Sequence, residues 1–88
     1  MANELRWSDD ASVVLLEDSV VLARLPDGPV WVIEGTGSQL VRQMVGTFTA
    51  DALVDWAVEV FEGDHGVIRS GVDDFLDMLC GVSLLIDA

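Results

Sequence analysis

The side chains best suited to nucleophilic or acid–base chemistry are few in this sequence, with one histidine, His65, and one cysteine, Cys80. A thiol nucleophile needs a base within hydrogen-bonding reach. These two residues fall at opposite ends of one predicted helix, roughly 20 Å apart at about 1.5 Å per residue. We therefore predict no catalytic pair, and we interpret Cys80 as a small residue buried in the core.

Carboxylates cluster at Asp73, Asp74 and Asp77, on about one turn of the same predicted helix. Three acidic residues on an exposed helix face without a histidine are typical of a solvated surface rather than a metal site. The sequence thus offers no catalytic residue and no metal ligand set, and we expect neither an enzyme nor a bound cofactor.

A glycine pair, Gly35-Thr36-Gly37, follows an apolar run and precedes a stretch of helical character. This order is that of a dinucleotide-binding loop, but Leu40 stands where the third glycine of that motif is needed. The chain is also too short for the alternating strands and helices of such a fold. We interpret the glycines as a hinge between strand and helix.

Charge excludes several classes of partner. The 88 residues include sixteen Asp and Glu, four Arg and no Lys, for a formal net charge of −12. Nucleic acids and anionic membranes are bound through clustered basic residues, so we expect neither as a partner. A cationic or neutral peptide or protein is favoured, although the charge alone also serves solubility.

Location is predicted from what the sequence lacks. It has no apolar run near the length that spans a bilayer, no recognisable secretory signal, and a single cysteine. These features fit a cytoplasmic protein.

The first half of the chain predicts a three-stranded antiparallel meander. Its strands are Val13–Leu16, Val20–Leu25 and Val30–Ile33, and the segment Leu25–Gly28 contains the Pro and Gly of a turn. Residues 1–11 are expected to be flexible or to form an edge strand around Glu4–Ser8.

The second half predicts three helices, which makes the fold α+β. The first helix begins near Thr36 or Ser38, either of which could cap it. The second is capped by Thr49. The third runs from Gly66 to about Cys80 with Asp64 as its cap, and residues 82–86 pack back as an apolar tail.

The last strand of the meander has a special place in this arrangement. Val30–Ile33 alternates so that Trp31 and Ile33 lie on one face and Val30 and Val32 on the other. Neither Lys nor a central Pro protects its edge. Such an edge either is covered by the N-terminal segment or the C-terminal tail, or is a docking site for a peptide that adds a strand.

Several motifs together resemble the PqqD-like family. Leu15-Leu16, a turn with Gly28, and the segment Trp31–Gly37 match its strand pair and its entry into the first helix. Thr49 with Leu53 matches the opening of its second helix, and Phe75-Leu76-x-x-Leu79 with Leu84-Leu85 matches its closing helix and apolar end. The resemblance covers about residues 12 to 86.

The resemblance implies a single winged-helix-like domain, residues 1–88, that recognises the leader of a ribosomally synthesised and post-translationally modified peptide (RiPP). Free-standing members of this length look like the leader-binding proteins of lasso-peptide clusters, which present a precursor to a transglutaminase-like cysteine peptidase. Carried onto this chain, the leader would add a strand to the third strand and lie against the third helix. The implied peptide-binding residues are Val30, Trp31, Val32, Ile33, Ile68, Val72, Phe75 and Leu76.

Two positions depart from the family pattern: Glu34 replaces a favoured Asn, and Gly71 replaces a frequent Asp. Two other functions remain open at this point. A winged-helix regulator would bind DNA, which the charge opposes. An acidic inhibitor or antitoxin-like protein would mask a basic partner.

Overall fold

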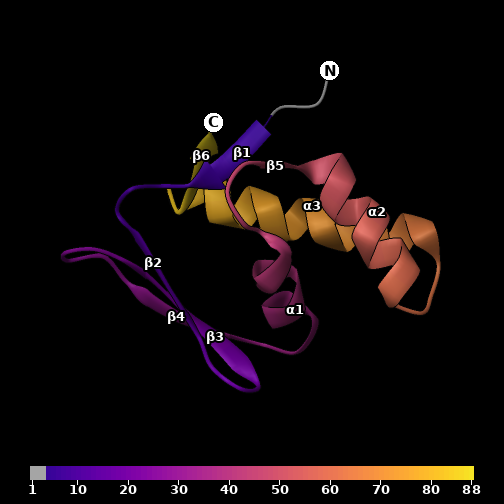
Figure 1. Ribbon diagram of the computed structural model, residues 1–88, viewed down its shortest axis with the longest axis horizontal. Helices are drawn as coiled ribbons and strands as arrows, with labels where there is room; N and C mark the ends of the chain where they lie inside the picture. The colour runs from indigo at the N-terminus through magenta and orange to yellow at the C-terminus, as the bar shows by residue number, and fades with distance from the viewer. Residues whose placement is uncertain (1–3) are drawn as a thin grey trace.

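The chain folds into an antiparallel meander followed by three helices, and a second small sheet joins its two ends (Figure 1). This computed structural model describes residues 4–88. The elements are β1 (Glu4–Trp7), β2 (Ala11–Leu15), β3 (Ser19–Arg24), β4 (Val30–Glu34), α1 (Gly35–Gln43), β5 (Phe48–Thr49), α2 (Ala50–Val60), α3 (His65–Gly81) and β6 (Leu85–Asp87).

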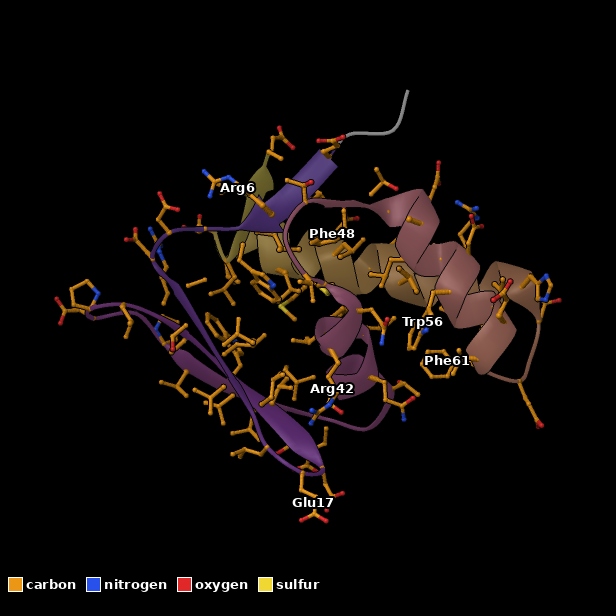
Figure 2. All side chains as sticks on the ribbon, in the orientation of Figure 1. Arg6, Glu17, Arg42, Phe48, Trp56 and Phe61 are labelled. Carbon is orange, nitrogen blue, oxygen red and sulfur yellow. The ribbon has the colours of Figure 1, made fainter. Side chains whose placement is uncertain are left out.

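The predicted meander is confirmed, with strand order β2-β3-β4 and antiparallel pairing throughout. The central strand β3 is the most buried because its inward residues Val20 and Leu22 are fully covered. Arg42 connects α1 to the β2–β3 turn (Figure 2). Its guanidinium donates hydrogen bonds to the carbonyls of Leu16 and Ser19.

Helices α2 and α3 begin at the predicted caps. The Thr49 hydroxyl accepts the Ala52 N–H at 3.1 Å. The Asp64 carboxylate accepts the N–H groups of Gly66 at 2.8 Å and Val67 at 3.1 Å. Each cap satisfies amides that have no partner inside the helix.

The cap predicted for α1 is wrong. The helix starts at Gly35, directly after β4, and the residue that precedes it, Glu34, makes no capping hydrogen bond through its side chain. The buried Ser38 hydroxyl instead donates to the Gly35 carbonyl at 2.8 Å. With no loop between strand and helix, Thr36 and Ser38 already lie inside the first turn.

The second sheet was not predicted. Its order is β5-β1-β6, so β1 is a central strand rather than the edge strand or flexible segment expected there. Two short segments from distant parts of the chain flank it, and local sequence patterns do not report such pairing. The Trp7 indole N–H also donates to the Met44 carbonyl at 2.8 Å.

The core lies between the inner face of the meander and the helices. The apolar tail packs back as predicted, because Leu84 and Leu85 are buried and Leu85 opens β6. No helix within residues 4–88 combines the length and apolar character required to cross a membrane. The buried apolar residues are Val20, Leu22, Leu40, Val41, Met44, Leu53, Val54, Ala57, Val72, Leu76, Leu79, Leu84 and Leu85.

Candidate functional site: an open strand edge beside an apolar groove

Strand β4 is an edge of the meander. Within residues 4–88 it pairs with β3 alone, and neither β1 nor β6 reaches it, because those strands form the separate second sheet. The alternative in which the chain's own termini cover this edge is therefore wrong for the part of the chain described.

The register identifies which backbone groups face the open side. The Arg24 N–H donates to the Pro29 carbonyl at 3.3 Å. Hydrogen-bonded and non-hydrogen-bonded pairs alternate along an antiparallel ladder. The next hydrogen-bonded positions toward β3 are thus Trp31 and Ile33. The residues whose N–H and C=O groups point to the open edge are Val30, Val32 and Glu34.

Side chains of β4 alternate as the sequence predicts. Trp31 and Ile33 are half-buried and pack against the core. Val30 and Val32 lie on the outer face with 63% and 61% of their surface exposed. Among the residues that the structure describes, the strand therefore offers one unpaired backbone edge together with one inward and one outward row of side chains.

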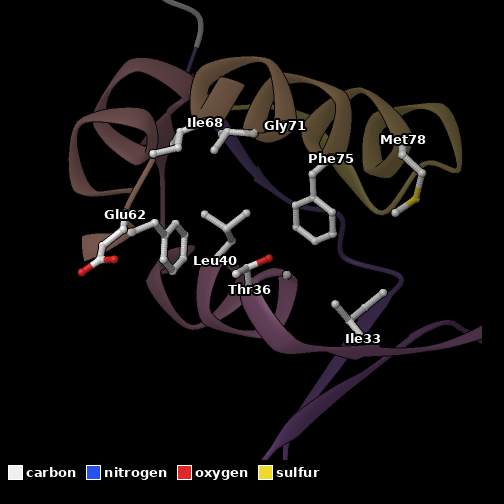
Figure 3. Close-up of a pocket in the computed structure, with 11 residues that line it drawn as sticks. Ile33, Thr36, Leu40, Glu62, Ile68, Gly71, Phe75 and Met78 are labelled. Atoms are coloured by element: carbon white, nitrogen blue, oxygen red, sulfur yellow. The ribbon is translucent and has the colours of Figure 1, made fainter. Parts of the chain in front are cut away.

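A groove lies beside this edge, between the β4–α1 junction, the end of α2 and one face of α3 (Figure 3). Its volume is about 560 Å³. We call it the apolar groove because most of its lining is hydrophobic. The lining residues are Ile33, Thr36, Gly37, Leu40, Phe61, Glu62, Ile68, Gly71, Val72, Phe75 and Met78.

Four of the predicted peptide-binding residues meet in this groove: Ile33 from β4, and Ile68, Val72 and Phe75 from α3. Leu76 does not line it. It is 4% exposed and belongs to the core, because it lies about 100° around the helix from Phe75. Among the others, Trp31 packs on the core beside the groove, and Val30 and Val32 lie on the opposite face of the strand.

Seven lining residues were not predicted. Gly71 and Met78 lie four residues before and three after Phe75, so helical spacing alone could have placed them on the same face. Phe61 and Glu62 come from the end of α2, and only the packing of α2 against α3 brings them there. The Phe61 ring meets Trp56 edge-on, with centroids 5.5 Å apart and planes at 80°, which fixes its position.

The glycine pair has two distinct roles. The first glycine, Gly35, has a φ of +64°, a conformation that other residues rarely adopt. It lets the chain turn directly from β4 into α1. At Gly37 a β-carbon would lie 2.7 Å from Ile33 Cγ2 and 3.7 Å from Phe75 Cε1. The second glycine thus permits close packing at the floor of the groove.

The two candidate catalytic residues, His65 and Cys80, lie at opposite ends of α3. His65 begins α3 and Cys80 lies next to its last residue. Cys80 is exposed, so its interpretation as a core residue is wrong. Although the residue is exposed, the pKa of its thiol is raised above the ordinary value, first by partial loss of solvent around the thiol and then by the negative charges of Asp77 and Asp87. A raised pKa keeps the thiol protonated and unreactive at neutral pH.

Asp73, Asp77, Asp87 and Cys80 border a second cavity, of about 490 Å³, away from the apolar groove. Within residues 4–88 no group of three or more His, Cys, Asp or Glu is arranged to hold a metal ion. The open edge and its groove are the features with a geometry suited to binding.

Comparison with known proteins identifies the fold. No protein-family model matches the chain, and no curated protein does. Among solved structures it matches TbiB1 in complex with the TbiA(beta) leader peptide, with a TM-score of 0.82. The chain has the fold of TbiB1.

The match extends over 91% of this chain and 93% of TbiB1, at 24% sequence identity. The α+β arrangement of a three-stranded antiparallel sheet and three helices, predicted from the sequence, is therefore confirmed. The resemblance to leader-recognition proteins, first drawn from hydrophobic spacing, is supported at the level of the fold.

Proposed function

We propose that this protein is a leader-peptide recognition element of RiPP biosynthesis. The observation that carries the proposal is the edge of β4 beside the apolar groove, which no strand of residues 4–88 pairs with. The fold shared with TbiB1, a protein in complex with a leader peptide, supports it. In this proposal the leader forms a fourth strand on β4 and places alternate side chains against α3.

The dimensions of the two walls agree. Five residues of β4 extend over about 17 Å. The α3 wall from Ile68 to Met78 measures about 15 Å along the helix axis. A leader segment of about five extended residues therefore fits both walls at once. The backbone of Val30, Val32 and Glu34 offers it alternating donors and acceptors.

Binding of this kind depends on burial more than on hydrogen bonds. Two leader side chains that each bury about 100 Å² in the groove would contribute about 5 kcal/mol before costs. Each new hydrogen bond replaces one to water and adds only about 1 kcal/mol. Ordering a flexible leader opposes both contributions, so affinity requires the strand and the groove together.

In this proposal the protein catalyses no covalent step. It holds the leader and thereby raises the concentration of the precursor near a separate enzyme. The resemblance to PqqD-like proteins of lasso-peptide clusters suggests a transglutaminase-like cysteine peptidase as that enzyme, acting in the cytoplasm on the bound precursor. In the same proposal the chain, residues 1–88, is a single winged-helix-like domain.

The backbone contribution is tested by replacing Val32 with Pro. Proline removes the N–H that faces the open edge and leaves the bonds between β3 and β4 intact, since those use Trp31 and Ile33. We expect Val32→Pro to weaken peptide binding at least about tenfold, because a backbone bond is lost and the proline ring crowds the added strand. Val32→Ala, which keeps the N–H, is the control.

The groove contribution is tested by filling it. A β-carbon at Gly71 meets no atom within 4 Å, so Gly71→Leu would project into the groove without disturbing α3. Gly81 has the same free surroundings at the end of α3 but does not line the groove, and Gly81→Leu is the matched control. We expect only Gly71→Leu to abolish binding.

Two probes are suitable for both tests: the TbiA(beta) leader peptide, and a displayed library of random peptides selected on the wild-type protein. Fluorescence anisotropy measures the affinity of each peptide, and circular dichroism checks that every variant is folded. The proposal would be refuted if the peptides bound Val32→Pro and Gly71→Leu with the same affinity as they bind the wild type. Such binding, if it also disappeared in salt, would favour the acidic inhibitor instead.

A further inference from the structure

The charges around the apolar groove are of one sign. Among its lining residues Glu62 is the charged one, and none of the four arginines of the chain borders it. Arg6 and Arg69 lie beside Asp9 and Asp51, at 3.1 and 3.4 Å. Arg42 donates to carbonyls of the β2–β3 turn, and Arg24 ends β3. Within residues 4–88 the groove therefore contains no cation.

Glu62 lies at one end of the groove. It follows Phe61 in the chain, and Figure 3 shows it at the outer edge of the groove, on the side of Ile68, with its carboxylate turned away from Phe75. The side chain is exposed, and within residues 4–88 it belongs to no ion pair. A second negative charge comes from Asp74, which is exposed on α3 next to Phe75 in the sequence.

An apolar groove with a carboxylate at one end favours one kind of peptide. We infer that the peptide bound here combines an apolar anchor near Phe75 with a Lys or Arg that reaches Glu62. This inference rests on the function proposed above and specifies the chemistry of the peptide. An acidic peptide would be repelled both by Glu62 and by the net charge of −12.

The separation between anchor and base follows from the helix. Ile68 and Phe75 are seven residues apart in α3, or about 10 Å along its axis. An extended peptide covers that distance in about three residues. The basic residue should thus occur about three positions from the anchor. Whether it precedes or follows the anchor depends on the direction in which the peptide runs along β4.

The experiment uses the displayed random-peptide library on the wild-type protein, with Gly71→Leu as a counter-selection that removes peptides bound elsewhere. The retained peptides are sequenced and their affinities measured against two variants of equal charge. Glu62→Gln removes the carboxylate at the groove. Glu59→Gln removes an exposed carboxylate of α2 that does not border it. A general attraction to an acidic protein affects both variants equally, whereas local recognition affects only the first.

We expect groove-dependent peptides to be enriched in Lys or Arg about three residues from an apolar side chain. Their affinity should fall about two- to fivefold in Glu62→Gln and remain unchanged in Glu59→Gln. Replacing the peptide's basic residue with Gln should lower wild-type affinity and make it insensitive to Glu62→Gln. Each result would support the inference.

Groove-dependent peptides without basic enrichment, or equal effects of the two variants, would overturn this inference and leave the proposed function standing. A selection that returns no groove-dependent peptide would overturn both. The two failures are therefore distinguishable in one experiment.

Discussion

Two glycines that border the same groove are subject to opposite constraints. A β-carbon at Gly37 would collide with Ile33 Cγ2 at 2.7 Å, whereas one at Gly71 would meet no atom within 4 Å. Gly71 therefore weakens α3 without any packing reason. It leaves the groove open at this position, where any longer side chain would occupy the space in which we propose that a leader binds.

Substituting alanine at each position tests this difference. Gly71→Ala should raise the free energy of unfolding by about 0.5–1 kcal/mol, because alanine is the better helix former and has room. Gly37→Ala should lower it by about 1–3 kcal/mol, because Ile33 must move. Urea denaturation measures both values. Changes of the same sign in the two variants would contradict this account of the groove floor.

Helix α3 is the element on which the site depends. It forms one wall of the groove through Ile68, Gly71, Val72, Phe75 and Met78, and it buries Leu76 and Leu79 in the core. Its beginning is held by Asp64, which was correctly predicted from the sequence because a cap lies next to the amides it serves. The sequence did not distinguish the residues of α3 that face the core from those that face the groove. Leu76, which was predicted to bind peptide, is buried in the core.

Removing the cap should loosen this wall. Asp64→Ala leaves two amides, those of Gly66 and Val67, without their acceptor, and should lower the free energy of unfolding by about 1–2 kcal/mol. Asp64→Asn keeps an acceptor oxygen and should cost much less. Chemical denaturation followed by circular dichroism provides the measurement. An alanine variant as stable as wild type would show that the cap contributes little to α3.

At the scale of the whole molecule, negative charge is the dominant electrostatic property. Sixteen acidic residues face four arginines. The ion pairs within residues 4–88, Arg6–Asp9 and Arg69–Asp51, involve exposed side chains. Such pairs contribute at most about 1 kcal/mol each. Repulsion between carboxylates therefore outweighs the attraction that salt would screen.

Salt should accordingly stabilise the folded protein. Raising NaCl from about 20 to 300 mM shortens the screening length and should increase the Tm by a few degrees. KCl should act equally at the same ionic strength, since screening does not depend on the identity of the cation. Thermal unfolding followed by circular dichroism measures the effect. A Tm that falls with added salt would mean that the ion pairs are worth more than the repulsion.

The sequence alone determined the features that depend on near neighbours. Period-two and helical spacing predicted the meander and three helices, and short-range chemistry predicted the caps at Thr49 and Asp64. Turn residues and alternation predicted that Trp31 and Ile33 share a face of the last strand. The net charge needed no structure at all. Each of these properties is set within a few residues along the chain.

The tertiary structure decided what depends on distant segments. It placed β1 between β5 and β6, which left the edge of β4 open in the part of the chain described. It brought Phe61 and Glu62 to the groove, turned Leu76 into the core, and left Cys80 exposed. A periodic pattern shows which residues share a face but not which surface that face meets. Whether a strand edge stays open is therefore settled only when the whole chain has packed.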